Sequence, residues 1–198
     1  MIPAHFRGRP AALLRTCHID TPLGGVLLAA SADGLAGLWF DAQRHHPDTS
    51  GWEPAPDHAL LQDAAGQLQD YLAGRRTGFD LPLDLSRGTP FQQAVWHALL
   101  AIPRGGTHSY GALGLALGRP AAMRAVGAAV GRNPLSVIVP CHRVIGADGS
   151  LTGYAGGLDR KRALLTLEGV ALPPADRGPA ARHVGNTSAA RERTREVA

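Results

Sequence analysis

The chain has few of the residues that hold small secreted proteins together. It contains only two cysteines, Cys17 and Cys141, among 198 residues, and no CxxC pair. A disulfide framework, a zinc ribbon and a dithiol redox centre are therefore excluded. Sparse, unpaired cysteines are typical of a reducing compartment, so we expect the protein in the cytoplasm.

Long apolar runs and a leader-like segment are also missing. The longest apolar stretches, such as 26–30 and 137–139, fall far short of the ~20 residues that a membrane span needs. Residues 1–16 lack the apolar run of a secretory signal. We therefore expect no membrane partner. The hydrophobic content of 44% still suffices for one substantial core or two small ones.

The net charge of +4 is modest, but it is unevenly distributed. Residues 1–87 carry a net charge of −3, residues 88–170 carry +5, and residues 171–198 carry +2. A basic section suggests a polyanionic partner, because arginines that neutralise phosphates release counterions and bind without sequence preference. A solvated basic face explains the same charge equally well.

The first part of the chain combines strand and helix patterns. Asp33-Gly34 between two apolar runs is a strong hairpin signature, and apolar residues at helical spacing in 58–74 predict an amphipathic helix. Residues 43–56, rich in His, Pro, Asp and Gly, predict a loop. Strands are predicted at 16–20, 26–31, 35–40 and 79–85. These elements predict an α+β domain over residues 1–87 with a small antiparallel sheet.

The second part of the chain is mostly helical. Thr89-Pro90 supplies an N-cap and a proline at the first helical position. Helices are predicted at 91–102, 109–118, 121–131 and 158–169. The second and third of them, joined by a tight turn, have the shape of a helix-turn-helix, although a core helical hairpin fits the same pattern. The apolar run 136–139 predicts a strand before Cys141, and residues 173–198 predict a disordered tail.

Cys141 is the residue most open to a chemical role. It follows an apolar run and precedes His142 and Arg143. A thiolate is the reactive form of cysteine, and nearby cationic groups favour it. A single cysteine beside an apolar run is, on its own, more often a small buried hydrophobic residue.

Five blocks of sequence, in order, resemble one protein family. They are SYGALG, RAVG at Arg124, NP, IVPCHRVIG and GYAGGLDRKRALLTLEG. The chain resembles the O6-alkylguanine-DNA alkyltransferases, also called methylated-DNA–protein-cysteine methyltransferases, densely over 89–170 and loosely over 15–86. The resemblance implies a ribonuclease H-like N-terminal domain, and a winged-helix-like helix-turn-helix domain over residues 88–172. It also implies DNA repair by irreversible transfer of an alkyl group from O6 of guanine, and by extension from O4 of thymine, to the protein.

The resemblance assigns a chemical role to several residues. Cys141 would accept the alkyl group, with a thiol pKa below the ~8.5 of a free cysteine. His142 would polarise the thiol through a water, and Glu168 would orient the imidazole. Tyr110 would donate a hydrogen bond to the departing guanine, and Asn133 would tie the helix-turn-helix to the segment before Cys141.

Further residues are implied to bind the base and the DNA. Val130 and Tyr154 would form walls of the base pocket, while the carbonyl of Val144 and the N–H of Ala155 would contact the base. Arg124 would enter the duplex in place of the extruded nucleotide. The remaining DNA-binding residues are expected to be Arg119, Arg132 and Arg143. Each of these residues, taken alone, also has an ordinary structural explanation.

Neither a cofactor nor a metal is expected. Positions that match the zinc ligands of some animal members hold Ala12, Ser31 and Ala36, and the loop histidines match no known ligand spacing. The expected partner is double-stranded DNA containing alkylated guanine, bound by a monomer. Two alternatives remain: a non-catalytic DNA-binding module, and a cysteine hydrolase that uses Cys141 with His97 or His108.

Overall fold

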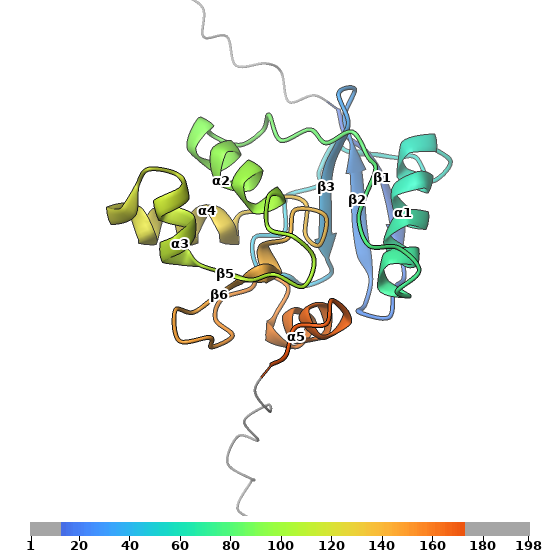
Figure 1. Cartoon of the computed structure of the whole chain (residues 1–198). Helices are drawn as coiled ribbons and strands as arrows, with labels where there is room; N and C mark the ends of the chain where they lie inside the picture. Colours follow the sequence, from blue (N-terminus) through green and yellow to red (C-terminus); the bar gives the residue numbers. More distant parts are fainter. Residues whose placement is uncertain (1–12, 173–198) are drawn as a thin grey trace, which may run out of the picture.

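The computed structural model describes residues 13–172, so the tail predicted at 173–198 lies outside the described residues. Figure 1 shows a sheet flanked by one helix, with a group of helices beyond its β3 edge. The elements in chain order are β1 (Arg15–Ile19), β2 (Val26–Ala30), β3 (Leu35–Phe40), β4 (Glu53–Pro54), α1 (Ala59–Leu72), α2 (Pro90–Leu100), β5 (His108–Ser109), α3 (Tyr110–Ala116), η1 (Pro120–Ala122), α4 (Met123–Gly131), η2 (Cys141–Arg143), β6 (Val144–Ile145) and α5 (Leu158–Leu167). The α+β class predicted from the sequence is confirmed.

The predicted hairpin forms at the expected turn. β2 and β3 pair antiparallel on either side of Asp33-Gly34, and the N–H of Ser31 donates to the carbonyl of Gly34 at 2.9 Å. Gly34 has a φ of 151°, which a residue with a Cβ rarely adopts. β1 pairs antiparallel with β2 and completes the predicted meander.

The sheet differs from the prediction in two places. β4 lies in the segment predicted as a loop and pairs parallel with β1, so the sheet is mixed and has the order β3-β2-β1-β4. The predicted strand 79–85 is wrong, since only Leu83 forms a bridge to Leu35. Pro82 explains the interruption, because it has no N–H to donate to a ladder.

The first helix places a polar group deep in the structure. Leu61, Ala64, Leu68 and Tyr71 of α1 are buried at helical spacing and pack on the sheet. Tyr71 is the last buried residue of this stripe. Its ring lies in the core, and its hydroxyl donates to the carboxylate of Glu168 near the end of the second half.

The second half begins with a strong helix signal. In α2 the Thr89 hydroxyl accepts from the N–H of Gln92, whose side chain accepts from the N–H of Thr89, so the two form a capping box before Pro90. α3 and α4 pack together as the predicted helix pair, joined by Gly118 with a φ of 66° and the short η1 turn. Gly114 of α3 allows the turn to pack closely, since a Cβ there would lie 3.2 Å from the carbonyl oxygen of Arg119.

The apolar run before Cys141 is not a strand. Residues 136–139 form successive turns, and Val137 has a φ of 71°, an unusual value for a β-branched residue. The Asn133 side chain causes this bend, because it binds the N–H of Leu135 and the carbonyl of Val139 and so replaces strand partners. The turns deliver Cys141 at the beginning of η2.

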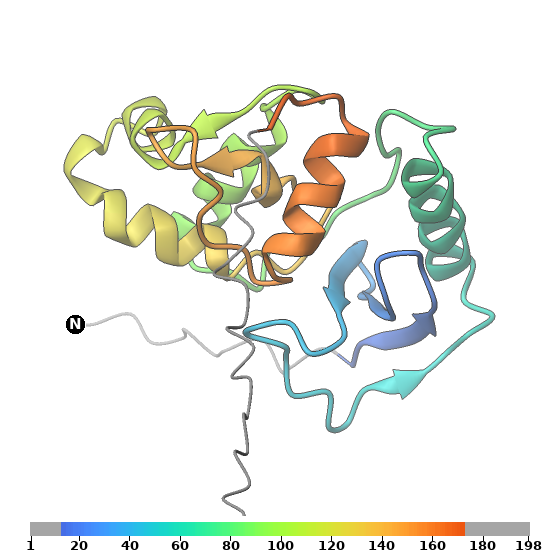
Figure 2. The ribbon, with the colours of Figure 1, turned by 90° about the horizontal axis from the view of Figure 1, so that it is seen from below.

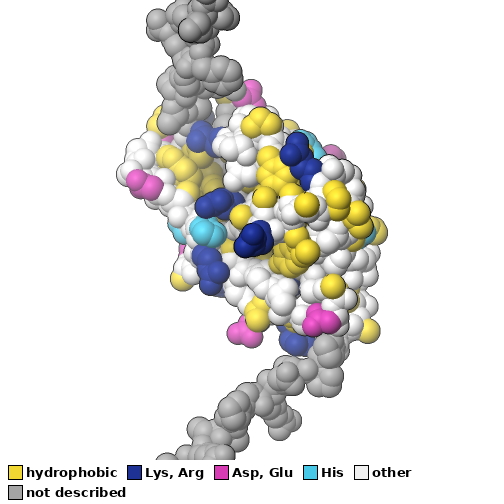
Figure 3. All heavy atoms as spheres, turned by 90° about the vertical axis from the view of Figure 1, so that its left-hand side faces the viewer, with side chains coloured by type: hydrophobic (Ala, Val, Ile, Leu, Met, Phe, Trp, Pro, Cys, Tyr) yellow, Lys and Arg dark blue, Asp and Glu magenta, His cyan; other side chains and the backbone are white. Residues whose placement is uncertain are grey.

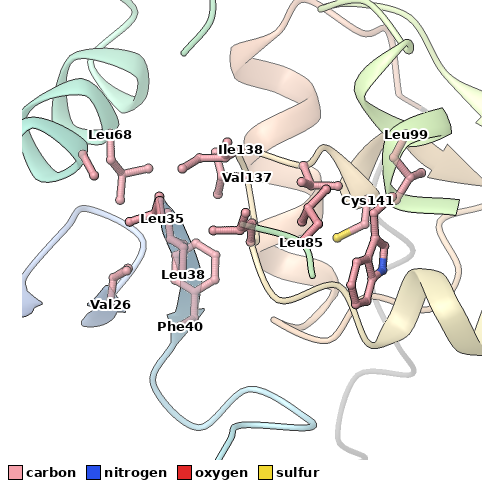
Figure 4. Packing of buried hydrophobic residues seen from close by; sticks show 14 of the residues in the cluster. Val26, Leu35, Leu38, Phe40, Leu68, Leu85, Leu99, Val137, Ile138 and Cys141 are labelled. Carbon is pink, nitrogen blue, oxygen red and sulfur yellow. The ribbon is translucent and has the colours of Figure 1, made fainter. Parts of the chain in front are cut away.

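The two halves share one core. Val26, Leu38 and Cys141 belong to the same buried cluster, and Figure 4 shows sheet residues on one side and Cys141 beside Leu85 and Leu99 on the other. β3 also bonds to the second half at its edge, since the N–H of Leu38 donates to the carbonyl of Pro134 at 2.8 Å. Seen from below in Figure 2, α5 lies between the sheet and the other helices of the second half.

Within residues 13–172, no helix has both the length and the apolar character needed to cross a membrane.

Candidate active site

Cys141 is almost completely buried, with 4% of its surface exposed. The amide nitrogen of Asn133 lies 3.1 Å from its sulfur. Burial raises the pKa of the thiol, because a thiolate in the core loses its hydration, while the Asn133 amide and the Lys161 charge act in the opposite direction. The prediction of a lowered pKa is therefore wrong for the protein alone, and Cys141 is a thiol at neutral pH.

Asn133 connects the helix pair to the site. It follows α4 and is 4% exposed. Its side-chain amide donates to the carbonyl of Val139 at 2.8 Å, and its side-chain oxygen accepts from the N–H of Leu135 at 3.0 Å. The residue therefore fixes both the backbone before Cys141 and the position of the sulfur.

Glu168 is the centre of a buried hydrogen-bond network. One carboxylate oxygen accepts from Nε2 of His142 at 2.5 Å and from the hydroxyl of Tyr71 at 2.5 Å. The other accepts from Nε of Arg143 at 2.9 Å. Glu168 caps the end of α5, His142 and Arg143 lie in η2, and Tyr71 lies in α1. Three segments that are distant in sequence therefore meet here.

The expectation that Arg143 contacts DNA needs correction. Arg143 is only 8% exposed. Its side chain points into the core and also donates to the carbonyl of Ile102. A guanidinium held by Glu168 at 2.9 Å is not available to a phosphate. Arg143 instead supplies the positive charge that keeps Glu168 ionised in the core.

The network sets the proton positions of His142. Burial alone would raise the pKa of Glu168, but hydrogen bonds from His142, Arg143 and Tyr71 outweigh it and lower the pKa to about 2. Burial lowers the pKa of His142, against the attraction of Glu168, so the imidazole is neutral at pH 7. Because Glu168 is a carboxylate, Nε2 carries the proton. Nδ1 is buried, has no hydrogen-bond partner within the described chain, and is free to accept a proton.

Lys161 is a buried cation that the sequence analysis did not single out. Its ammonium donates to the carbonyls of Val144 and Thr152 at 2.5 and 2.6 Å, and burial lowers its pKa to about 8. It favours the Cys141 thiolate electrostatically. The signal was present, since Lys161, Leu164 and Glu168 share one face of the last helix.

A cavity of about 260 Å³ opens over this region. It collects several residues assigned by resemblance, namely Tyr110, Arg132, Tyr154 and Ala155, together with Arg44, His45, Gly127, Ala128, Gly131 and Gly153. The Tyr110 hydroxyl lies 3.3 Å from the carbonyl of Gly153. Val130, Val144 and Cys141 do not line the cavity, since all three are buried in the core. Tyr110 and Tyr154 of the lining are close enough to Cys141 to interact with it electrostatically.

The other predicted DNA-binding arginines lie on the surface. Arg124 is exposed in the first turn of α4, and Arg119 is exposed in the turn before it, 6.0 Å from the ring of Phe91. Arg132 is exposed directly after α4. Figure 3 shows basic side chains and a histidine gathered in the middle of the face that carries the second half of the chain.

Other candidate residues are not brought to Cys141. His97 and His108 are both exposed, and neither forms a hydrogen bond with the buried thiol. No group of three His, Cys, Asp or Glu side chains in residues 13–172 is close enough to hold a metal ion. The arrangement can instead deprotonate one buried thiol through a neutral imidazole backed by a carboxylate.

Models of a single family match both halves of the chain. The ribonuclease-like domain of 6-O-methylguanine DNA methyltransferase matches residues 14–85, and the DNA binding domain of the same family matches residues 90–170.

Relatives and solved structures are similar over most of their own length. The methylated-DNA–protein-cysteine methyltransferase of Mycobacterium tuberculosis is 53% identical over 150 residues, which is 76% of this chain and 89% of that protein. The protein of the same name from Methanosarcina barkeri is 45% identical over 151 residues, which is 76% of this chain and 94% of that protein. The crystal structure of Mycobacterium tuberculosis OGT in complex with DNA matches with a TM-score of 0.74 and 51% identity, and covers 78% of this chain and 93% of that one.

Proposed function

The chain belongs to the 6-O-methylguanine DNA methyltransferase family, and from this premise we propose that it transfers alkyl groups from O6 of guanine in DNA to the sulfur of its own Cys141. It is a methylated-DNA–protein-cysteine methyltransferase that repairs O6-methylguanine. The observation that carries the role of Cys141 is its sulfur 3.1 Å from the Asn133 amide, directly before His142, whose imidazole is held by Glu168.

The proton of the thiol leaves by a short relay. Nδ1 of neutral His142 accepts it through a bridging water, and the ionised Glu168 stabilises the imidazolium that forms. Because the free thiol has a raised pKa, this transfer accompanies the reaction rather than precedes it. Asn133 and Lys161 stabilise the charge that develops on the sulfur.

The alkyl transfer is a single displacement. The sulfur of Cys141 forms a bond to the alkyl carbon while the bond between that carbon and O6 breaks, and the electron pair stays on guanine. The guanine anion takes up a proton as it leaves, and the imidazolium of His142 releases the proton it took from the thiol, so the base departs neutral and His142 becomes neutral again. Tyr110 donates to the ring nitrogen N3 and stabilises the departing base. The thioether product has no comparable leaving group, so each molecule reacts once.

The base is bound by the loop and helices around the cavity. Tyr154 forms a wall, and the N–H of Ala155 donates to O6. Val130 and Val144 act from behind this lining, Val144 through a carbonyl that already accepts from Lys161 and has a second lone pair free.

The substrate is duplex DNA with the damaged nucleotide extruded. Extrusion costs a few kcal/mol, less where damage has weakened pairing. Arg124 fills the space that the nucleotide leaves, and Arg119 and Arg132 contact phosphates. O4-alkylthymine is a second substrate of the same pocket. The site residues all come from one chain, so we place the active form as a monomer, in the cytoplasm where Cys141 stays reduced.

We place the boundary between the halves at residue 87, as expected from sequence. The described residues up to this boundary supply the α+β part, and residues 88–172 carry the alkyl-acceptor group and most of the DNA-binding groups. A non-catalytic DNA-binding module is the main competitor, but it has no use for a thiol held by Asn133.

Stoichiometry tests the proposal. A fixed amount of protein is titrated with duplex DNA containing O6-methylguanine, and the methylated base left in the DNA is measured. We expect removal to stop at one methyl group per protein molecule. A hydrolase would continue past that point, and a binding module would remove none.

A further inference from the structure

The cavity rim contains a basic segment from the N-terminal half, Arg44-His45, that no sequence motif had indicated. Arg44 and His45 line the same cavity as Tyr110, Tyr154 and Arg132, although Tyr110, the first residue of the helix pair, lies 65 residues after His45 in the sequence. Both are exposed. The N-terminal half therefore contributes directly to the edge of the substrate site.

This segment is held in one conformation. Ala42 and His45 have φ values of 57° and 61°, the left-handed region that residues with a Cβ rarely adopt. Between them, the buried side chain of Gln43 accepts from the N–H of Phe40 at 2.9 Å and lies 3.3 Å from the Ser136 hydroxyl. Two unfavourable backbone conformations around an anchored residue persist only where the surroundings enforce them.

The segment is also fixed to the loop that binds the base. The backbone N–H of Arg44 donates to the carbonyl of Ala155 at 2.9 Å. Nearby, Arg160 donates to the carbonyls of Leu23 and Gly156 at 2.7 and 3.0 Å and lies 4.6 Å above the ring of Phe40. The guanidinium of Arg44 is thus carried on a backbone that is tied to the substrate loop.

The guanidinium groups at the rim have no partner among the described residues. Within residues 13–172, neither the guanidinium of Arg44 nor that of Arg132 forms a hydrogen bond or an ion pair. The nearest acidic residue along the chain, Asp41, pairs with His18 at 3.0 Å. Two unpaired guanidinium groups and an imidazole on the rim of one cavity complement a phosphodiester anion.

We propose that Arg44, with His45 and Arg132, binds a backbone phosphate of the DNA strand beside the extruded nucleotide. This inference rests on the proposed function, because it places the damaged base in the cavity below. It gives the N-terminal half a role in substrate binding: Arg44 extends the phosphate contact of Arg132, at the end of the helix pair, onto the N-terminal half.

The test removes the guanidinium and keeps the backbone contact. Arg44→Ala retains the N–H that donates to Ala155, and Arg75→Ala is the matched control, since Arg75 is an exposed arginine of the same half that pairs with Asp70 at 2.7 Å. Both are made in a Cys141→Ser background so that the lesion persists. Binding to duplex DNA with O6-methylguanine is measured over a range of salt concentrations. Affinity falls as salt rises, and Arg44→Ala should make this dependence shallower, reducing the magnitude of the slope of log affinity against log salt by about one. Arg75→Ala should leave the slope unchanged.

Neutral linkages locate the contact. One phosphate at a time around the lesion is replaced by an uncharged methylphosphonate. At one linkage next to the lesion, affinity for the Cys141→Ser protein should fall about fivefold to tenfold, and the Arg44→Ala variant should lose nothing further there. The proposal is overturned if Arg44→Ala and Arg75→Ala have equal slopes. It is also overturned if, at every linkage, the loss of affinity caused by the neutral linkage and the loss caused by Arg44→Ala multiply. If the protein with Cys141 intact takes up no alkyl group, the proposed function is contradicted. The salt dependence of DNA binding is measured in the Cys141→Ser background and does not depend on that outcome.

Discussion

Glu168 decides the chemistry of the site at the scale of single residues. Its carboxylate is shared by an imidazole, a phenol and a guanidinium, all buried. The family resemblance implied the pairing of His142 with Glu168, but not the direction of the Arg143 side chain. In the sequence Arg143 lies two residues after the nucleophile. Only the packing of η2 against α5 in the structure shows that its charge compensates that of Glu168.

Replacing Glu168 by Gln tests the relay. The variant loses the anion that stabilises protonated His142, so transfer should slow by about tenfold to a hundredfold near neutral pH. The remaining reaction should depend on thiolate formed without the relay, so its rate should rise with pH toward the raised pKa of Cys141. The measurement is the rate of alkylation by free O6-benzylguanine against pH.

Two controls accompany this variant. Asp159→Asn removes an exposed carboxylate from the first turn of α5 and should keep the parent pH profile. Glu168→Gln should also keep the parent DNA affinity and its salt dependence, since Glu168 is buried away from any phosphate, and its melting temperature shows whether the loss of a partner for Arg143 unfolds it. An unchanged pH profile in a folded Glu168→Gln protein would rule out the relay.

At the scale of elements, local patterns predicted the helices better than the strands. α1 follows from apolar residues at helical spacing, and α2 from the N-cap and proline at Thr89-Pro90; both signals are visible within a few residues. The run 136–139 looked like a strand because its composition is apolar and β-branched. The observed turns depend on Asn133, whose side chain bonds to the N–H of Leu135 and to the carbonyl of Val139. No local sequence pattern predicts such a contact.

Arg124 on α4 provides the prediction at this scale. Its side chain is exposed in the first turn of a helix that borders the cavity through Gly127, Ala128 and Gly131. If it fills the space of the extruded nucleotide, Arg124→Ala should slow repair of duplex DNA at least tenfold more than it slows reaction with free O6-benzylguanine. The ratio of the two rates is the measurement. Equal losses on both substrates would show that Arg124 supports the fold rather than extrusion.

At the scale of the whole molecule, the halves are less separate than their compositions suggest. A change of charge near residue 87 predicted a boundary, yet one buried cluster runs from Val26 in the sheet to Val144 beyond the thiol. The edge of β3 is completed by residues around Pro134 and Leu83, far away in the chain. Contacts of such sequence separation depend on tertiary packing. The sequence therefore predicted most of the elements, but it did not predict how the halves join, the buried Lys161 or the inward direction of Arg143.

The central claim is that Cys141 itself receives the alkyl group. Intact mass and peptide mapping are measured before and after exposure to duplex DNA containing O6-methylguanine, with Cys141→Ser and Cys17→Ser as matched single-cysteine variants. We predict a gain of one methyl group, about 14 Da, on the peptide containing Cys141, with no gain in Cys141→Ser and a full gain in Cys17→Ser. A methyl group on Cys17, or loss of the lesion from DNA with no change in protein mass, would contradict the account.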